Sequence, residues 1–185
     1  KTGLRFTLTK ANQQDLPWLF ELMQERDIHR LCIYHLVPTG RGAKITGFAP
    51  THEETRAAMD LIFQKTRELT GQGFEMEVLT ADNHADSGYL YLDVLKNDPR
   101  RAEEVWNLLN WTGGNQSGRA IACIDSDGTV YPDQFWRSEP LGNLRERSFT
   151  DIWQDTPVPL LDELRDRTER LPDRCQGCAF LTTCN

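Results

Sequence analysis

The sequence predicts an α/β fold of parallel strand–helix units, followed by a small α+β domain that is rich in loops. Two observations predict the first part: residues 3–69 alternate strand-like apolar runs with amphipathic helices, and the connections between them are short. A third observation marks the second part, since three of the five cysteines fall within residues 175–184. We expect the domain boundary near residue 72, with one domain over 1–72 and the other over 73–185.

The first strand–helix unit begins with GLRFTLT, residues 3–9, which has the β-branched and aromatic content of a strand. Pro17 lies in the first turn of the following helix, where a missing N–H costs little. The helix has apolar residues at i, i+3, i+4 and i+7, and these give it one apolar face: Leu16, Leu19, Phe20 and Met23.

The second unit begins with LCIYHLV, residues 31–37, an almost continuously apolar run of the kind found in strands covered on both faces. Thr51 to Glu54 form a capping box, which predicts a helix from there to about Leu69. Two such units are too few for a closed barrel or an independently stable sheet. We therefore expect the chain to be part of a longer protein.

From about residue 71 the predicted elements become shorter. They are a strand and an irregular stretch over 74–92, a helix from about Pro99, a glycine-rich loop over 113–118, a hairpin over 120–136 that turns at Ser126–Gly128, a turn at Gly142–Asn143, a short helix capped by Ser148 and Asp151, and a charged helix over 160–170.

Composition excludes some classes of function. The chain has 28 acidic and 21 basic residues and a net charge of -7, which argues against a broad nucleic-acid interface. No apolar run approaches the roughly 20 residues of a membrane span. We expect a cytoplasmic protein, where clustered thiols indicate metal binding or redox chemistry more often than disulfides.

The C-terminal cysteines have the spacing C-x2-C-x5-C, from Cys175 through Cys178 to Cys184. Three thiolates on short loops can hold a zinc ion, which takes four ligands in a tetrahedron, or an iron–sulfur cluster, which takes about one per iron. The spacing alone leaves both open. Cys123, on the predicted hairpin, and Asp133, at its far end, are candidates for a fourth ligand. Cys32 lies within an apolar strand, where a buried small side chain is expected.

The order of the motifs resembles that of radical S-adenosylmethionine (radical SAM) enzymes with an auxiliary-cluster SPASM or twitch domain. The motifs are HLVPTGRG, TADNHADSGY, WTGGNQSG, DGTVYPDQFW, LGNLRERSF and the final C-x2-C-x5-C. The likeness is greatest to the radical SAM proteins of heme d1 and alternative heme biosynthesis. In the family the hairpin reads G-x4-C, whereas here Asp133 follows Gly128 at that spacing, and a second cysteine is replaced within 113–118. This departure implies one auxiliary [4Fe–4S] cluster instead of two.

The resemblance implies that the first domain is the last part of a radical SAM partial TIM barrel. Enzymes of this family bind S-adenosylmethionine on a second [4Fe–4S] cluster, held by C-x3-C-x2-C, and cleave it to a radical that abstracts a substrate hydrogen. That motif does not occur in this sequence. We expect this chain to be the C-terminal portion of such an enzyme, and inactive alone.

The resemblance also implies the ligands. The cofactor would meet the residues that end the two strands, namely Thr7, Thr9, Leu36, Val37 and Pro38. The substrate would be an iron tetrapyrrole related to didecarboxysiroheme, from which propionate groups are removed, and a ferredoxin or flavodoxin would supply electrons.

Carboxylates favour arginine, so Arg41 is a candidate at the active site, and Arg119 and Arg137 are candidates beside the hairpin. His35, at the end of a strand, could bind iron or move a proton. Two alternatives remain: a SPASM-type enzyme that modifies a peptide, and a non-catalytic iron–sulfur or zinc-binding module.

Overall fold

The computed structural model describes residues 2–155, 157–167 and 170–184. The chain divides into two compact units, Lys1–Pro99 and Arg100–Asn185. The boundary between the units lies after Pro99, beyond the position near residue 72 expected from the sequence, so that a third strand and a third long helix belong to the first unit.

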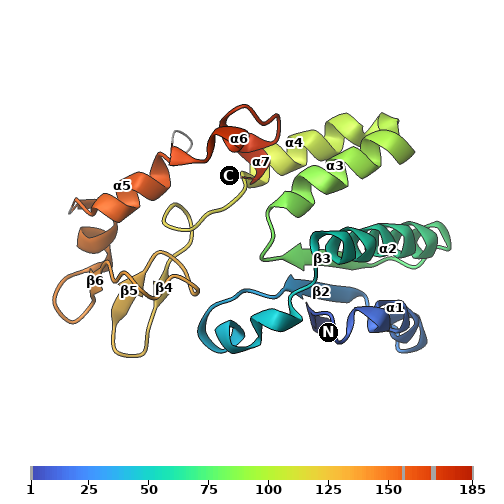
Figure 1. Ribbon diagram of the computed structural model, residues 1–185, viewed down its shortest axis with the longest axis horizontal. Helices are drawn as coiled ribbons and strands as arrows, with labels where there is room; N and C mark the ends of the chain where they lie inside the picture. The colour runs from blue at the N-terminus through green and yellow to red at the C-terminus, as the bar shows by residue number, and fades with distance from the viewer. Residues whose placement is uncertain (1, 156, 168–169, 185) are drawn as a thin grey trace. The chain divides into compact units, whose positions relative to one another are not determined.

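The first unit is built on a parallel sheet of three strands in the order β1-β2-β3. Figure 1 shows the elements in chain order, and their bounds are β1 (Leu4–Leu8), η1 (Gln13–Asp15), α1 (Leu16–Glu25), β2 (Arg30–His35), η2 (Gly40–Phe48), α2 (His52–Gly71), β3 (Glu77–Ala81) and α3 (Ala85–Asn97). The predicted parallel strand–helix units are confirmed. The irregular stretch expected after β3 is wrong, because α3 occupies most of it.

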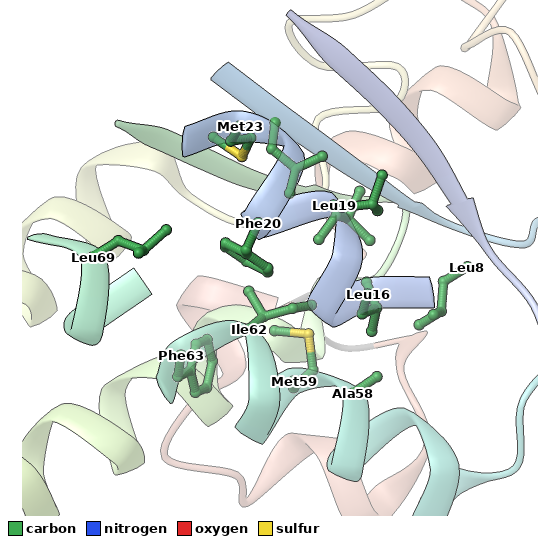
Figure 2. Packing of buried hydrophobic residues seen from close by; sticks show 12 residues of the cluster. Leu8, Leu16, Leu19, Phe20, Met23, Ala58, Met59, Ile62, Phe63 and Leu69 are labelled. Carbon is green, nitrogen blue, oxygen red and sulfur yellow. The ribbon is translucent and has the colours of Figure 1, made fainter. Parts of the chain in front are cut away.

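The core of the first unit joins one face of the sheet to α1 and α2. All four apolar positions predicted for α1 are buried. In Figure 2, Leu16 and Phe20 of α1 point toward Met59 and Ile62 of α2. In the sheet, the fully buried cluster takes Leu8, Leu31 and Ile33. These apolar contacts fix the distance and order of the layers.

The opposite face of the sheet is different from what the apolar run 31–37 predicted. Cys32 and Tyr34 alternate with the buried Leu31 and Ile33 but are only half-buried. Within the described residues of this unit, β2 is therefore covered fully on one face only. Arg5 of β1 lies over the ring of Tyr34 on the second face, 4.8 Å from the ring centroid, and donates a hydrogen bond to its hydroxyl.

The helix α2 begins at the predicted capping box. The Glu54 amide donates to Thr51 Oγ1 at 3.2 Å, and the Thr51 amide donates to Glu54 Oε2 at 2.7 Å. Both exposed amides at the start of the helix thus have partners. None of the helices in the described parts of the chain is long and apolar enough to cross a membrane.

The second unit consists of short elements joined by turns. They are η3 (Pro99–Arg101), which straddles the boundary, α4 (Ala102–Thr112), β4 (Cys123–Ile124), β5 (Thr129–Tyr131), β6 (Gly142–Asn143), the π-helix η4 (Asp151–Asp155), α5 (Pro159–Arg165), α6 (Asp173–Gln176) and α7 (Leu181–Cys184). The three strands form an antiparallel sheet in the order β4-β5-β6. Its core cluster is small: Val130, Leu141, Ile152 and Leu161.

The predicted hairpin is confirmed as β4 and β5, with Gly128 in a left-handed conformation at the turn. The reciprocal bonds between Ser148 and Asp151 are also confirmed. Two predictions are wrong. The turn expected at Gly142–Asn143 pairs with β5 as a third strand, and the charged helix ends at Arg165 because Asp166 leaves the helical conformation.

Candidate functional site

The carboxyl-terminal edge of the parallel sheet carries a buried histidine–carboxylate pair. His35 ends β2, and Asp86 lies in the first turn of α3, which follows β3. His35 Nε2 is 2.8 Å from Asp86 Oδ2, and the two side chains are 12% and 8% exposed. Asn83 Nδ2 donates to the other oxygen, Asp86 Oδ1, at 2.7 Å. The imidazole is therefore held in one orientation, with its Nε2 on a fixed carboxylate.

The loop that positions this pair is unusual in its backbone. Asp82, the first residue after β3, has a φ of 70°, a conformation that few residues other than glycine adopt. The chain turns there so that α3 begins three residues later and its first turn meets the end of β2. His35 was predicted from the sequence as a candidate, whereas Asp86 and Asn83 were not. The available signal was the cluster of Asp and Asn directly after a strand.

The residues expected to contact the cofactor lie at the same edge. Thr7 is in β1, and Thr9 follows it. The Thr9 hydroxyl donates to Asn12 Oδ1 at 2.9 Å, and Asn12 Nδ2 donates to the Thr7 carbonyl at 2.9 Å, so both threonines also shape the turn into η1.

Leu36, Val37 and Pro38 continue from β2. After Pro38 the chain turns back so closely that a Cβ on Gly42 would lie 2.2 Å from the Val37 carbonyl oxygen. Position 42 therefore requires glycine. The side chain of Arg41 lies outside the part of the chain that the structure describes.

In the second unit, the C-terminal cysteines lie on two short helices. Cys175 is in α6, Cys178 follows in the turn, and Cys184 ends α7. The Cys178 amide donates to the Cys175 carbonyl at 3.0 Å, which closes the turn between the first two thiols. Burial raises the pKa of the Cys184 thiol, and Cys175 and Cys178 raise it further.

The helix α4 anchors this cysteine segment. The Thr182 hydroxyl donates to Asn110 Oδ1 at 2.8 Å. The rings of Trp106 and Phe180 meet edge to face, with centroids 5.9 Å apart. A polar and an aromatic contact thus hold α7 against α4, and with it the position of Cys184.

The candidates for a fourth ligand have different surroundings. Cys123 is half-buried in β4. Asp133 accepts from the Ser117 hydroxyl through Oδ2 and from the amides of Phe135 and Trp136 through Oδ1, at 2.7 and 2.9 Å. Oδ1 therefore serves the turn after β5, and Oδ2 ties that turn to the glycine-rich loop. Among the described residues, no three His, Cys, Asp or Glu side chains form a group that could hold a single metal ion.

The two arginines beside the hairpin also differ. Arg137 forms an ion pair with Asp125 and lies over the ring of Tyr131, so its charge is already neutralised within the unit. Arg119 is exposed at the end of the glycine-rich loop.

Comparison with known proteins agrees with this arrangement. Residues 116–179 match the SPASM family, an iron–sulfur cluster-binding domain. The chain is 47% identical over its whole length to the Fe-coproporphyrin III synthase of Methanosarcina barkeri, and it covers 47% of that protein. It is 38% identical to the pre-heme d1 synthase of Dinoroseobacter shibae, of which it covers 46%. The chain thus spans about half the length of these relatives.

Solved structures share the fold. The structure of native anSMEcpe with bound AdoMet matches 98% of this chain and 45% of its own, with a TM-score of 0.65 and 14% identity. Streptococcus suis SuiB matches 99% of this chain and 41% of its own, with a TM-score of 0.62 and 17% identity. The mixed α/β fold is therefore shared with these proteins, and most of the second unit matches an iron–sulfur cluster-binding domain.

Proposed function

We propose that this chain, which carries a SPASM iron–sulfur domain and resembles radical SAM enzymes along its whole length, works as the C-terminal part of an enzyme that modifies an iron tetrapyrrole. The observation that carries the proposal is the match of residues 116–179 to the SPASM family, a region that includes Cys175 and Cys178 and ends five residues before Cys184. The names of two similar proteins, an Fe-coproporphyrin III synthase and a pre-heme d1 synthase, support the substrate class.

The three thiols fit an auxiliary cluster better than a single ion. A zinc ion requires four ligands converging on one point, whereas the thiolates of a cluster bind different irons and lie farther apart. Cys178 is exposed and Cys184 is partly buried, so a cluster here would lie at the surface of the second unit. Cys123 is the better candidate for a fourth ligand, because it is also a thiol and because the oxygens of Asp133 already have partners.

The sheet edge of the first unit supplies protein groups for catalysis. S-adenosylmethionine, when bound, supplies the radical that abstracts a hydrogen from substrate. Thr7, Thr9 and the backbone of residues 36–38 would contact this cofactor, as strand ends do in βα barrels. His35 would hold or move a proton there, with Asp86 fixing the orientation of its ring. Arg41 would bind a substrate carboxylate.

The reaction that we propose first is removal of propionate side chains from a siroheme-derived precursor. The 38% identity to a pre-heme d1 synthase supports this reaction. The higher identity to an Fe-coproporphyrin III synthase favours a second candidate. A coproporphyrin keeps its propionates, so that reaction would instead remove whole acetate side chains from the precursor, because loss of carbon dioxide alone would leave two methyl groups on one ring carbon.

The test uses the full-length enzyme, purified without oxygen and supplied with didecarboxysiroheme, S-adenosylmethionine and a reductant. We expect 5′-deoxyadenosine to form together with a tetrapyrrole of lower mass. Loss of three-carbon propionate groups supports the first reaction, and loss of two-carbon acetate groups with the propionates retained supports the second. No 5′-deoxyadenosine above background and an unchanged tetrapyrrole would contradict the proposed function. Replacing the chemical reductant with reduced ferredoxin or flavodoxin tests the electron donor.

A further inference from the structure

The second unit contains a buried arginine for which the described residues supply no ion-pair partner. Arg167 follows α5 and is only 9% exposed. Its Nη2 donates to the Asn115 carbonyl, but its Nε–H is buried and has no hydrogen-bond partner among the residues that the structure describes. A buried cation that lacks a counter-ion is unfavourable, and a protein retains one mainly where something else pairs with it.

A second positive charge makes this environment more unusual. Burial lowers the pKa of Arg167, and the nearby guanidinium of Arg119 lowers it further. Two carboxylates of this unit have other partners. Glu163 pairs with Arg170 at 3.3 Å, and Asp133 accepts from Ser117 and from backbone amides. Two arginines therefore share a region in which no described carboxylate neutralises them.

The backbone around Arg167 is held firmly. The end of α5 packs on the glycine-rich loop, where Gly118 has a φ of 70° and a Cβ would lie 2.6 Å from Leu164 Cδ1. Arg165 Nε donates to the Gly118 carbonyl at 3.3 Å. With the bond from Arg167 to Asn115, two arginines tie the same loop to the end of the same helix. The guanidinium of Arg167 is thus preorganised, and it is unlike a solvated surface arginine.

We propose that Arg167 and Arg119 form an anion site in the SPASM unit, and that this site binds a carboxylate of the tetrapyrrole substrate. The identification of the ligand rests on the proposed function. Guanidinium groups are suited to carboxylates because they donate several hydrogen bonds in a fixed plane. Arg119 is exposed and Arg167 keeps part of its surface in solvent, so an anion can reach the pair. A bound carboxylate would supply the missing counter-charge.

The test compares two forms of one ligand on the full-length enzyme. Iron coproporphyrin III and its methyl ester have the same ring, but only the first has free carboxylates. Binding is followed by the change in Soret absorbance. We expect the acid to bind wild-type enzyme more tightly than the ester. Arg167→Met should weaken binding of the acid about tenfold to a hundredfold, the range for a lost charged hydrogen bond, and leave the ester unaffected.

Two further variants make the result specific. Arg170→Met removes a neighbouring arginine that is already paired with Glu163, and we expect the affinity for the acid to stay within about twofold of wild type. Arg119→Gln changes an exposed residue, so it provides the same test if Arg167→Met does not fold. It should weaken binding of the acid by about threefold to tenfold.

The outcomes separate this inference from the proposed function. If wild-type enzyme binds neither ligand, both the substrate class and the identity of the anion are wrong. If it binds acid and ester equally well, the substrate class survives and the carboxylate site is overturned. The site is also overturned if Arg167→Met leaves the affinity for the acid unchanged, or alters the spectrum of the auxiliary cluster while binding stays the same. In the ligand-free enzyme, Arg167→Met should melt at or above the wild-type temperature, because it removes an unpaired buried charge.

Discussion

The two units of the chain are stabilised in different ways. In the first, helices of 10, 20 and 13 residues and strands of five or six residues surround a cluster of twelve buried apolar side chains. In the second, the strands have two or three residues and the core cluster contains four. Apolar burial is sufficient to explain the first fold. The second depends on turns, side-chain hydrogen bonds and, we infer, on the cluster that its cysteines hold.

Removing the auxiliary cluster should change the difference in stability between the two units more than any other experiment. In the proposed site, ligation by Cys175, Cys178 and Cys184 would join α6 to α7, so loss of the cluster should destabilise the whole second unit. We expect amide hydrogen exchange to become much faster over residues 100–184 after chelation of iron from the full-length enzyme. Exchange in α1 and α2 should change little. Equal loss of protection in both units would contradict the distinction.

Phe20→Ala is the converse experiment. Phe20 is 1% exposed in the core of the first unit, and truncation of such a side chain costs about 3–5 kcal/mol. The first unit should lose that stability in denaturant while iron content stays at the wild-type level. Trp18→Ala is the matched control, because Trp18 is 55% exposed on the same helix and should change stability by less than about 0.5 kcal/mol.

Gly118→Ala tests whether the packing of α5 on the loop matters to the second unit. The new Cβ would meet Leu164, and the positive φ disfavours any side chain, so we expect a loss of about 2–4 kcal/mol. The measurement is hydrogen exchange within the second unit. Gly47→Ala is the control, since nothing lies within 4 Å of its Cβ position. Similar behaviour of the two variants would count against this packing.

Asp86→Asn tests the histidine pair, which we expect to be independent of the auxiliary cluster. The variant keeps the shape of the side chain but removes the negative charge beside His35. The first unit should lose about 1–3 kcal/mol of stability as a result. We expect kcat of the full-length enzyme to fall at least about tenfold, with KM and iron content nearly unchanged. Asp27→Asn, at a carboxylate that is 86% exposed, should behave as wild type. A change in KM alone would indicate a purely structural role for Asp86.

Thr51→Ala should give the smallest effect, about 1 kcal/mol in the first unit, because it removes the cap of α2. Thr70→Ala, at the exposed far end of the same helix, is the control.

The contribution of this cap to stability also depends on pH. Hydrogen bonding from the Thr51 amide lowers the pKa of Glu54, so its contribution is present above the usual glutamate pKa and is lost as the pH falls through the lowered value. Glu54→Gln should remove that acid dependence in a denaturation series.

The sequence was most informative where local rules determine structure. The spacing of Leu16, Leu19 and Phe20 predicted a buried helix face, and Thr51 with Glu54 predicted the start of α2. Both depend on residues a few positions apart. The helix α3 was missed because its first turn contains Asp86 and Gly88, which are buried by contacts with the rest of the unit. Strand β6 was missed because Gly142 and Asn143 are typical of turns, and only pairing with β5 makes them a strand.

The candidate sites show the same division. Cysteine spacing and motif order predicted the iron–sulfur domain, since that information is local. The cluster of Asp and Asn after β3 was a local signal, but its pairing with His35 was not, because Asp86 is 51 residues away and reaches His35 only through the parallel pairing of β2 and β3. The burial of Arg167 was equally unpredictable, because the residue lies in a highly charged segment of the sequence. Its burial and its unpaired Nε follow from how α5 meets the glycine-rich loop.

The most direct test is the iron and acid-labile sulfide content of full-length enzyme purified without oxygen, as wild type and as two cysteine variants. Cys184→Ser should lose iron and sulfide equivalent to one cluster. Cys32→Ser, in β2 of the first unit, should retain the wild-type amounts. Stoichiometric zinc in place of iron, or identical iron and sulfide in Cys184→Ser and wild type, would contradict a cluster held by the last cysteines of the chain.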